Sequence, residues 1–303
     1  MRSETHGHGA AHKTGYGPLR LCRTILQLTD NLPCDSRKIM AIRSLSPRLG
    51  LWAFGSAAII LGVVGIAWGD FATNWQRVQP SVPFREPLAY FAAACELLSG
   101  FAIFWRRTAQ AGAFFLTILY SIFALLWLVQ IIASPLVYDN WGNFFEELSL
   151  VLAGAVASTM LAPPDSFRPR HTALASRLYG ICVVSFSLAH FVYFSAAATW
   201  VPKWIPPGQK FWIAATGAFF LMAAAAIFTG IAAKLATRLL TIMILCFEIL
   251  VWVPKLQAAP HDHFNWAGNA ICIALAAAAW VVSDSFRRSE APHTVGSRDF
   301  EIA

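Results

Sequence analysis

The sequence predicts an all-α polytopic membrane protein with about eight transmembrane helices arranged as two parallel four-helix bundles. Two features of composition carry this prediction. The chain of 303 residues is 57% hydrophobic and only 13% charged, whereas soluble domains carry roughly a quarter charged residues. Its mean hydropathy is +0.55. Lipid is therefore the expected solvent for most of the chain, and recurring turn motifs, described below, divide the spans into two sets.

Long stretches without Asp, Glu, Lys or Arg mark the spans. A helix needs about 20 predominantly apolar residues to cross a bilayer. Four stretches meet this requirement without any charge: 49–69, 108–138, 178–202 and 211–233. Four more contain or adjoin isolated carboxyl groups: 87–105, 144–163, 239–254 and 264–283. We therefore expect eight spans joined by short connections.

The basic residues are distributed unevenly between the two sides of the expected membrane. Only five lie in the connections after odd-numbered spans, whereas eleven lie at the other ends: Arg43, Arg48, Arg106, Arg107, Arg168, Arg170, Arg177, Lys234, Arg238, Arg287 and Arg288. Cytoplasmic loops carry an excess of Lys and Arg. We expect a bacterial inner-membrane protein with both termini in the cytoplasm. The net charge of +7 is thus a topology signal, and we expect no nucleic-acid partner.

Residues 1–45 differ from the rest of the chain because they are polar and rich in turn-forming residues. We expect them to be a disordered or mis-assigned N-terminal tail, with Met40 as an alternative start site. The six cysteines form no CxxC pair, which argues against a membrane dithiol oxidoreductase.

An internal repeat is predicted from four ordered landmarks. "LVQIIASPLVYDNWGN" at 128–143 matches "VPKLQAAPHDHFNWAGN" at 253–269, since each reaches a proline and returns through Asn-Trp. "GDF" at 69–71 and "AHF" at 189–191 are each followed by Val-Pro-x-x-x-Pro. The predicted units are 49–163 and 177–284, joined by a cytoplasmic linker at 164–176 and followed by a cytoplasmic tail at 285–303. An even number of spans makes them parallel repeats.

The second unit resembles the DoxX family of small four-helix membrane proteins. The resemblance lies in "AHFVYFSAAATWVPKWIPPGQKFWIAATG", "LVWVPKLQAAP", "NWAGN" and "AWVVSDS". It covers 177–284 well and 49–163 more weakly. Relatives in this family include small subunits associated with thiosulfate:quinone oxidoreductase. The resemblance therefore implies a quinone as a possible cofactor and a membrane or redox subunit as a possible partner, in addition to membrane lipids.

Four ionisable residues are candidates for a ligand or proton site. Glu96 and Glu248 lie deep in predicted spans, where a carboxylate costs several kcal/mol unless it is protonated or paired. Each alternatively serves as a neutral, hydrogen-bonded packing residue. Asp70 and His190 occupy equivalent positions in the two units, where they would either form a charge-assisted pair or act as independent helix-end residues.

The connections after odd-numbered spans carry conspicuous tryptophans, which include Trp141, Trp200, Trp204 and Trp266. An interfacial belt accounts for tryptophans at this level. A proline-bounded loop that lines a cavity is the alternative, since irregular backbone at membrane depth must be buried in protein.

Two other polar clusters receive ordinary interpretations. His261 and His263 have no further ligand nearby in sequence, so we expect no metal site. Glu146 and Glu147 are interpreted as acidic residues at a helix N-terminus, where negative charge suits the helix dipole.

We expect an accessory membrane module that binds a quinone, another lipid-soluble molecule or a partner subunit in an outer-facing aromatic cavity between the bundles. No P-loop, GxGxxG or nucleophile elbow is present, so we expect no self-contained catalytic activity. Two alternatives remain open. One is a membrane redox subunit that passes electrons to quinone, and the other is a small-solute or proton-coupled transporter that uses Glu96 and Glu248.

Overall fold

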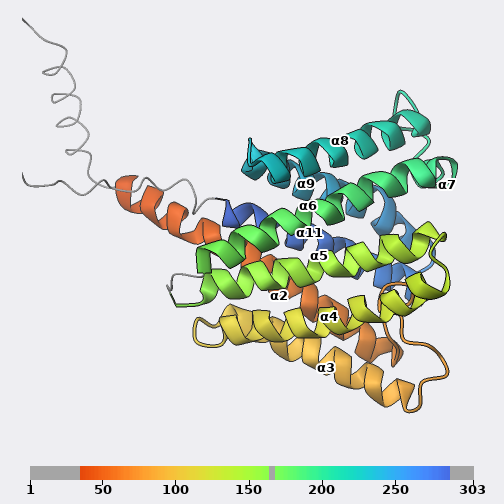
Figure 1. Cartoon of the computed structure of the whole chain (residues 1–303), viewed down its shortest axis with the longest axis horizontal. Coiled ribbons are helices and arrows are strands. Elements are labelled where there is room, and N and C mark those ends of the chain that lie inside the picture. Colours follow the sequence, from red (N-terminus) through yellow and green to blue (C-terminus); the bar gives the residue numbers. More distant parts are fainter. Residues whose placement is uncertain (1–34, 164–167, 287–303) are drawn as a thin grey trace, which may run out of the picture. The chain divides into compact units, whose positions relative to one another are not determined.

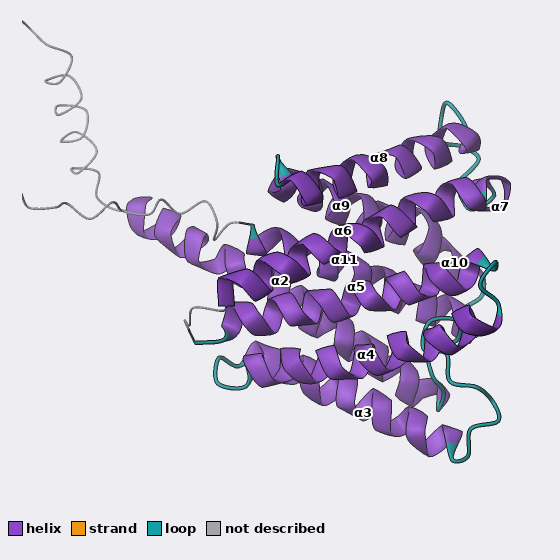
Figure 2. Cartoon of the chain, viewed as in Figure 1, coloured by secondary structure: helices purple, strands orange, loops and turns teal. Residues whose placement is uncertain are grey.

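The computed structural model describes residues 35–163 and 168–286. All regular structure in this part of the chain is helical (Figures 1 and 2). The helices are α2 (Asp35–Trp68), α3 (Arg85–Phe104), α4 (Ala109–Ala133), α5 (Tyr138–Leu161), α6 (Arg168–Val192), α7 (Phe194–Ala198), α8 (Gln209–Thr229), α9 (Ala233–Phe247), the π-helix η1 (Glu248–Trp252), α10 (Val253–Ala258) and α11 (His263–Ser285).

Eight helical segments of the described chain are long and apolar enough to span a membrane. They are α2 from Leu49, α3, α4, α5, α6 from Arg170, α8, the continuous segment α9–η1–α10, and α11. The predicted all-α polytopic membrane fold is confirmed. Each span overlaps the apolar stretch predicted for it, although the span in α6, Arg170–Val192, begins and ends earlier than the charge-free stretch 178–202.

Two segments that were predicted to lie outside the membrane spans are partly helical. Residues 35–45 were expected to belong to an irregular tail, but α2 already begins at Asp35. These residues belong to a separate unit that ends at Ser46, and residues 1–34 lie outside the described part. Similarly, α6 begins at Arg168 inside the expected linker. Residues 164–167 and 287–303 lie outside the described part as well.

Within the compact unit that begins at Pro47, consecutive helices pack side by side. Each helix in the order α3, α4, α5, α6 and α8 contacts the next, and α9 contacts both α8 and α11 (Figure 1). The last span, α11, is the most buried of the eight and also packs on α5 and α6. It meets α2 as well, where a Cβ on Gly50 would lie 3.2 Å from the Trp280 ring.

Small residues allow close approach where α2 crosses α3. A Cβ on Gly55 would lie 2.9 Å from the carbonyl oxygen of Gly100, and a Cβ on Gly100 would lie 2.7 Å from the carbonyl oxygen of Gly55. Only glycine leaves room for these backbones, as at small-residue interfaces between membrane helices. Large apolar side chains point outward instead. Those more than half exposed include Val63, Leu98, Phe115, Leu125, Leu221 and Ile249.

The connections lie at two ends of the helical body, which we call the aromatic face and the basic face. The aromatic face carries the connections 69–84, 134–137, 199–208 and 259–262, at the right-hand end of Figure 1. The basic face carries the turns 105–108 and 230–232, at the left-hand end. The functional features described next lie toward the aromatic face.

Candidate functional site

The connection 69–84 folds into the protein instead of lying on its surface. It contains no helix or strand, yet Phe71, Ala72, Trp75 and Gln76 are all less than 9% exposed. Irregular backbone at this depth must be enclosed by protein, since lipid cannot satisfy its polar groups. The first half of the chain therefore supplies a loop to the interior.

An ion pair holds the ends of this loop together. Arg85, the first residue of α3, pairs with Asp70, and its Nε donates to the carbonyl oxygen of Val78 at 3.2 Å. Its guanidinium group also lies 5.5 Å from the centroid of the Phe71 ring. A single arginine thus joins the beginning, middle and end of the loop.

Two consecutive loop residues bind two carboxyl groups from different helices. The indole Nε1 of Trp75 donates to Glu146 Oε2 at 2.5 Å, and the amide Nε2 of Gln76 donates to Glu96 Oε1 at 2.6 Å. The orientation of the Gln76 amide is fixed because its Oε1 accepts from the backbone N–H of Ala72 at 3.1 Å. The loop therefore connects α3 and α5 through their acidic side chains.

Glu147 lies beside these two groups without a hydrogen-bond partner. It is 1% exposed, and both of its carboxyl oxygens are buried and unpartnered. It interacts electrostatically with Glu96 and Glu146, and Tyr120 of α4 interacts with both Glu96 and Glu147. Three carboxyl groups at membrane depth are costly to keep. A buried unsatisfied group in a native protein needs an explanation, such as strain, a catalytic role or a bound water or ion.

A cavity of about 430 Å³ adjoins this acidic cluster at Glu146. Aromatic and small side chains form most of its lining, and the larger residues are Glu146, His190, Tyr193, Trp200, Phe247 and Trp252. Ligand pockets in proteins are typically apolar hollows of about 300–1,000 Å³ with a few polar groups. The cavity has both the size and the lining of such a pocket.

A second, smaller cavity of about 160 Å³ shares five lining residues with the first, including Glu146, His190 and Trp252. Its lining also includes Phe220 of α8 and Cys272 and Leu275 of α11. Because the shared residues lie on α5, α6 and the seventh span, the two cavities form one region between the halves of the chain.

His190 is held in one orientation at the wall of both cavities. Its Nδ1 lies 2.7 Å from the carbonyl oxygen of Phe186, and its ring centroid is 5.1 Å from that of Phe220. A carbonyl oxygen only accepts, so Nδ1 carries the hydrogen. In the neutral ring Nε2 is then left as an acceptor.

Trp252 lies in the wall of the cavity, at the centre of a cluster of aromatic rings. Its ring lies 5.8 Å from that of Trp75, 5.4 Å from that of Trp200 and 5.7 Å from that of Phe264, measured between centroids. Glycine at position 268 is required behind it, since a Cβ there would overlap the Trp252 ring. The seventh and eighth spans are thereby fitted to each other at the cavity.

A π-helix places Trp252 in this position. Pro254 has no backbone N–H to donate within the helix, and the five residues Glu248–Trp252 adopt the wider π-helical turn just before it. The side-chain Nδ2 of Asn269 donates a hydrogen bond to the carbonyl oxygen of Trp252 at 3.1 Å. π-helical turns within α-helices are often found at functional sites.

The residues predicted from the sequence as site candidates do not all lie at the cavity. His190 and Trp200 line it. Glu96 and Glu248 are 2% and 8% exposed but do not line it. Glu248 instead interacts with Cys272, which lines the smaller cavity. The exposed Trp204 is 74% accessible and lies outside the cavity.

Asp70 and His190, for which a mutual pair and independent roles were both left open, bind different partners. Asp70 pairs with Arg85, and its Oδ1 accepts from the backbone N–H of Phe71 at 2.7 Å. His190 instead bonds to Phe186 of its own helix. Equivalent places in the sequence thus have different partners in the two halves.

Trp141 and Trp266 occupy two matching corners of the aromatic face. Trp141 Nε1 donates to the carbonyl oxygen of Pro135 at 3.0 Å, and Trp266 Nε1 donates to that of Pro260 at 2.8 Å. The preceding asparagine donates to two carbonyls in each corner: Asn140 to Gln130 and Ser134, and Asn265 to Lys255 and Ala259. Adding 125 to every residue number of the first corner gives the second.

Sequence reasoning missed the residues that connect the cavity to the acidic cluster. The interpretation of Glu146 and Glu147 as helix N-terminal acids is wrong, because α5 begins at Tyr138 and places them two turns inside the helix. Trp75 and Gln76 lie ahead of the prolines of their connection, Pro80 and Pro83, and their spacing in the sequence does not single them out. A polar pair inside an otherwise apolar span was the available signal for Glu146 and Glu147.

No group of three His, Cys, Asp or Glu side chains within residues 35–163 and 168–286 is arranged to hold a metal ion. His263, from the histidine pair considered above, stacks on Trp68 with 5.1 Å between ring centroids. Comparisons of the chain with family models, with curated proteins and with solved structures returned no match.

Proposed function

We propose that the protein binds a lipid-soluble small molecule, with a quinone as the leading candidate, in the cavity between its two halves. The observation that carries this proposal is the cavity of about 430 Å³, whose aromatic lining includes Glu146 and His190. Flat, apolar ring systems pack well on aromatic side chains. A membrane-embedded cavity of this kind suits a ligand that arrives from lipid.

The lining also provides hydrogen-bond donors for a quinone. The carbonyl oxygens of a quinone only accept hydrogen bonds. The residues that line the cavity include Tyr193, which has a hydroxyl group, and Trp200 and Trp252, which have indole N–H groups. A protonated Glu146 adds another donor, because its Oε2 already accepts from Trp75. Polar groups that are few and fixed give orientation to a ligand held mainly by apolar contact.

The protein is proposed to be a tandem duplication of a four-helix unit that resembles the DoxX family. Support comes from the matching hydrogen bonds of Trp141 and Trp266 in corners 125 residues apart. The asymmetry of basic residues supports a bacterial inner-membrane location with both termini in the cytoplasm. In that orientation the cavity opens toward the outer side, where a partner subunit would have access to it.

Proton-coupled transport of a small solute is a second candidate function. The observation that favours it is Glu147, whose buried carboxyl oxygens have no partner and which adjoins Glu96. Intramembrane acids of this kind serve proton relays in transporters. Unaltered solute flux in both Glu96→Gln and Glu147→Gln, at wild-type expression, would eliminate this candidate.

Native mass spectrometry of protein extracted in lipid particles tests the binding proposal. Ala189 lines both cavities, so Ala189→Phe fills the proposed site. Ala225 is exposed on α8 and lines neither cavity, so Ala225→Phe is the matched control. We expect a short-chain quinone to remain bound to the wild type and to Ala225→Phe and to be lost from Ala189→Phe. Equal retention by all three proteins, or no retention by the wild type, would contradict the proposal.

A further inference from the structure

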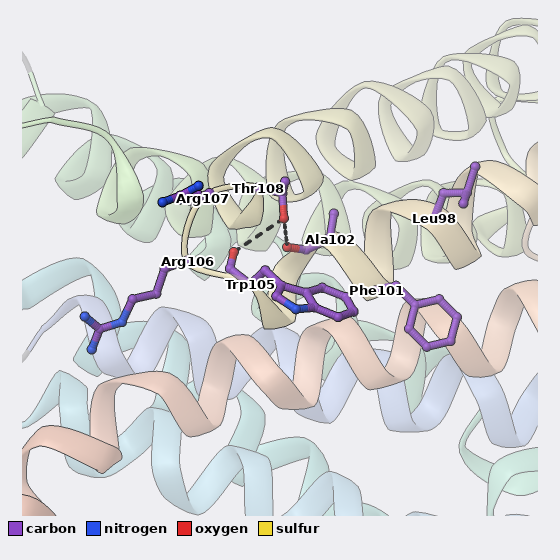
Figure 3. A pocket seen from close by; sticks show the side chains of 7 residues that line it. All are labelled: Leu98, Phe101, Ala102, Trp105, Arg106, Arg107 and Thr108. Atoms are coloured by element: carbon purple, nitrogen blue, oxygen red, sulfur yellow. Dashed lines mark hydrogen bonds between the residues drawn. The ribbon is translucent and has the colours of Figure 1, made fainter.

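The turn between α3 and α4 forms a cavity of about 590 Å³ on the basic face, at the opposite end from the proposed quinone site (Figure 3). Its lining combines apolar residues of α3 with two adjacent arginines. We propose that it binds one anionic diacyl phospholipid. The headgroup phosphate lies at Arg106 and Arg107, and an acyl chain lies along Leu98, Phe101 and Trp105.

The three apolar residues form a stripe along α3. Their spacing of three and four positions places them on one side of the helix. Leu98 is 71% exposed, Phe101 is 48% exposed and Trp105 is 62% exposed. Figure 3 shows the rings of Phe101 and Trp105 projecting from the same side of the ribbon. A stripe so open along a membrane span presents a continuous surface to an acyl chain.

Two positive charges stand at the end of the stripe. Both arginines line the cavity, and among the residues whose side chains the structure describes, 49–163 and 170–286, no carboxylate lies at ion-pair distance from either of them. Figure 3 shows the Arg106 side chain on the same side as Trp105, with Arg107 across the turn. Arg106 is therefore placed to bind the phosphate directly, whereas Arg107 adds positive potential to the same headgroup.

Hydrogen bonds fix the turn that carries the arginines. Thr108 Oγ1 donates to the carbonyl oxygen of Ala102 at 2.8 Å and lies 3.5 Å from that of Trp105 (Figure 3). The Thr108 backbone N–H also donates to the Trp105 carbonyl oxygen, at 3.1 Å. A fixed turn loses little conformational entropy when a ligand binds. The arginines are thus held at one end of the apolar stripe before the lipid arrives.

The turn between α8 and α9 shows that arginines are not needed to connect two such spans. Its residues are Gly230, Ile231 and Ala232, and Ile231 is 75% exposed. The arginine pair therefore adds a feature beyond joining two helices. A purely topological excess of positive charge would not require an apolar cavity beside it.

Native mass spectrometry with added lipid tests the proposal on the full-length protein in detergent. Phosphatidylglycerol and phosphatidylcholine with identical acyl chains are titrated separately, and the apparent Kd for the first bound lipid is compared. We expect phosphatidylglycerol to bind the wild type more tightly. Neutralising one interfacial basic residue corresponds to about a fivefold loss, so Arg106→Gln with Arg107→Gln should lose about 25-fold for phosphatidylglycerol. The loss for phosphatidylcholine should be smaller, because its choline cation offsets the charge of its phosphate.

Two further variants make the result specific. Arg238→Gln removes an exposed arginine near the start of α9, outside the cavity, and should leave both affinities unchanged. Trp105→Ala should weaken both lipids equally, because it removes contact with the acyl chain. Equal affinity of the wild type for the two lipids would overturn the proposal. An equal loss in Arg238→Gln, or displacement of the lipid by inorganic phosphate alone, would overturn it as well.

Discussion

Trp75 and Glu146 are joined by a hydrogen bond of 2.5 Å between the indole Nε1 and the carboxyl Oε2, which ties the connection 69–84 to α5. Both residues also line the smaller cavity. The same bond therefore closes the first-half loop over the acidic cluster and orients an acidic group toward the proposed ligand. Cavity, loop and carboxyl groups form one connected arrangement.

Trp75→Phe should destabilise the protein by about 1–2 kcal/mol, because it leaves Glu146 without its donor in a place that water reaches poorly. The matched control is Trp266→Phe, which removes an indole bond to Pro260 at an exposed position and should cost less, since water replaces it there. Thermal unfolding in one detergent measures both. An equal loss of thermal stability in the two variants would show that the hydrogen bond to Glu146 stabilises the protein no more than the exposed bond to Pro260.

Replacing Glu147 by leucine and replacing Glu96 by leucine should have different effects on stability. Glu147→Leu removes a carboxyl group whose oxygens are unpartnered, so the melting temperature should stay level or rise. Glu96→Leu removes the partner of Gln76 and leaves a buried amide unsatisfied, which costs about 1–3 kcal/mol. A large loss of stability in Glu147→Leu would mean that this side chain has a structural partner.

Gly268→Ala should displace the Trp252 ring and cost about 1–3 kcal/mol, the usual range for overpacking. The nearest atom to a Cβ on Gly142, in the corresponding helix of the first half, is 3.7 Å away. Gly142→Ala should therefore be neutral or stabilise by up to about 1 kcal/mol. Circular dichroism melts and Trp fluorescence would compare them, and equal stability of the two variants would contradict the close fit of Gly268 to Trp252.

A double-mutant cycle should find coupling between Asp70 and Arg85 and none between Asp70 and His190. The ion pair is partly exposed, with side-chain exposures of 28% for Arg85 and 36% for Asp70, so we expect less than about 1 kcal/mol. The variants are Asp70→Asn, Arg85→Gln and His190→Ala, and the measurement is the free energy of unfolding. Additivity in the first cycle with coupling in the second would reverse this assignment.

The membrane fold was predictable because burial in lipid requires long apolar stretches, and these appear directly in the sequence. The corner tryptophans were also visible as motifs, since a proline six residues before Trp141 and Trp266 supplies the carbonyl that each indole binds. Local spacing was sufficient in both cases. The hydrogen bonds involved span only a few residues.

The interior of the site was not predictable because it depends on contacts between distant segments. Gln76 reaches Glu96 across 20 positions, and Trp75 reaches Glu146 across 71. The sequence also left open whether Asp70 pairs with His190. That alternative relied on the equivalence of two halves, whereas Asp70 pairs with Arg85 at the other end of its own connection.

Photolabelling with an azido-quinone, followed by peptide mass spectrometry, tests the proposed binding of a quinone most directly. Label that is lost on competition with unmodified quinone should map to the segment that runs from His190 at the end of α6 to Trp200 just after α7, and to the seventh span around Phe247 and Trp252. The Ala189→Phe variant should lose this label, while Ala225→Phe should keep it. Competed label confined to other helices, or label insensitive to Ala189→Phe, would contradict a quinone site in the cavity.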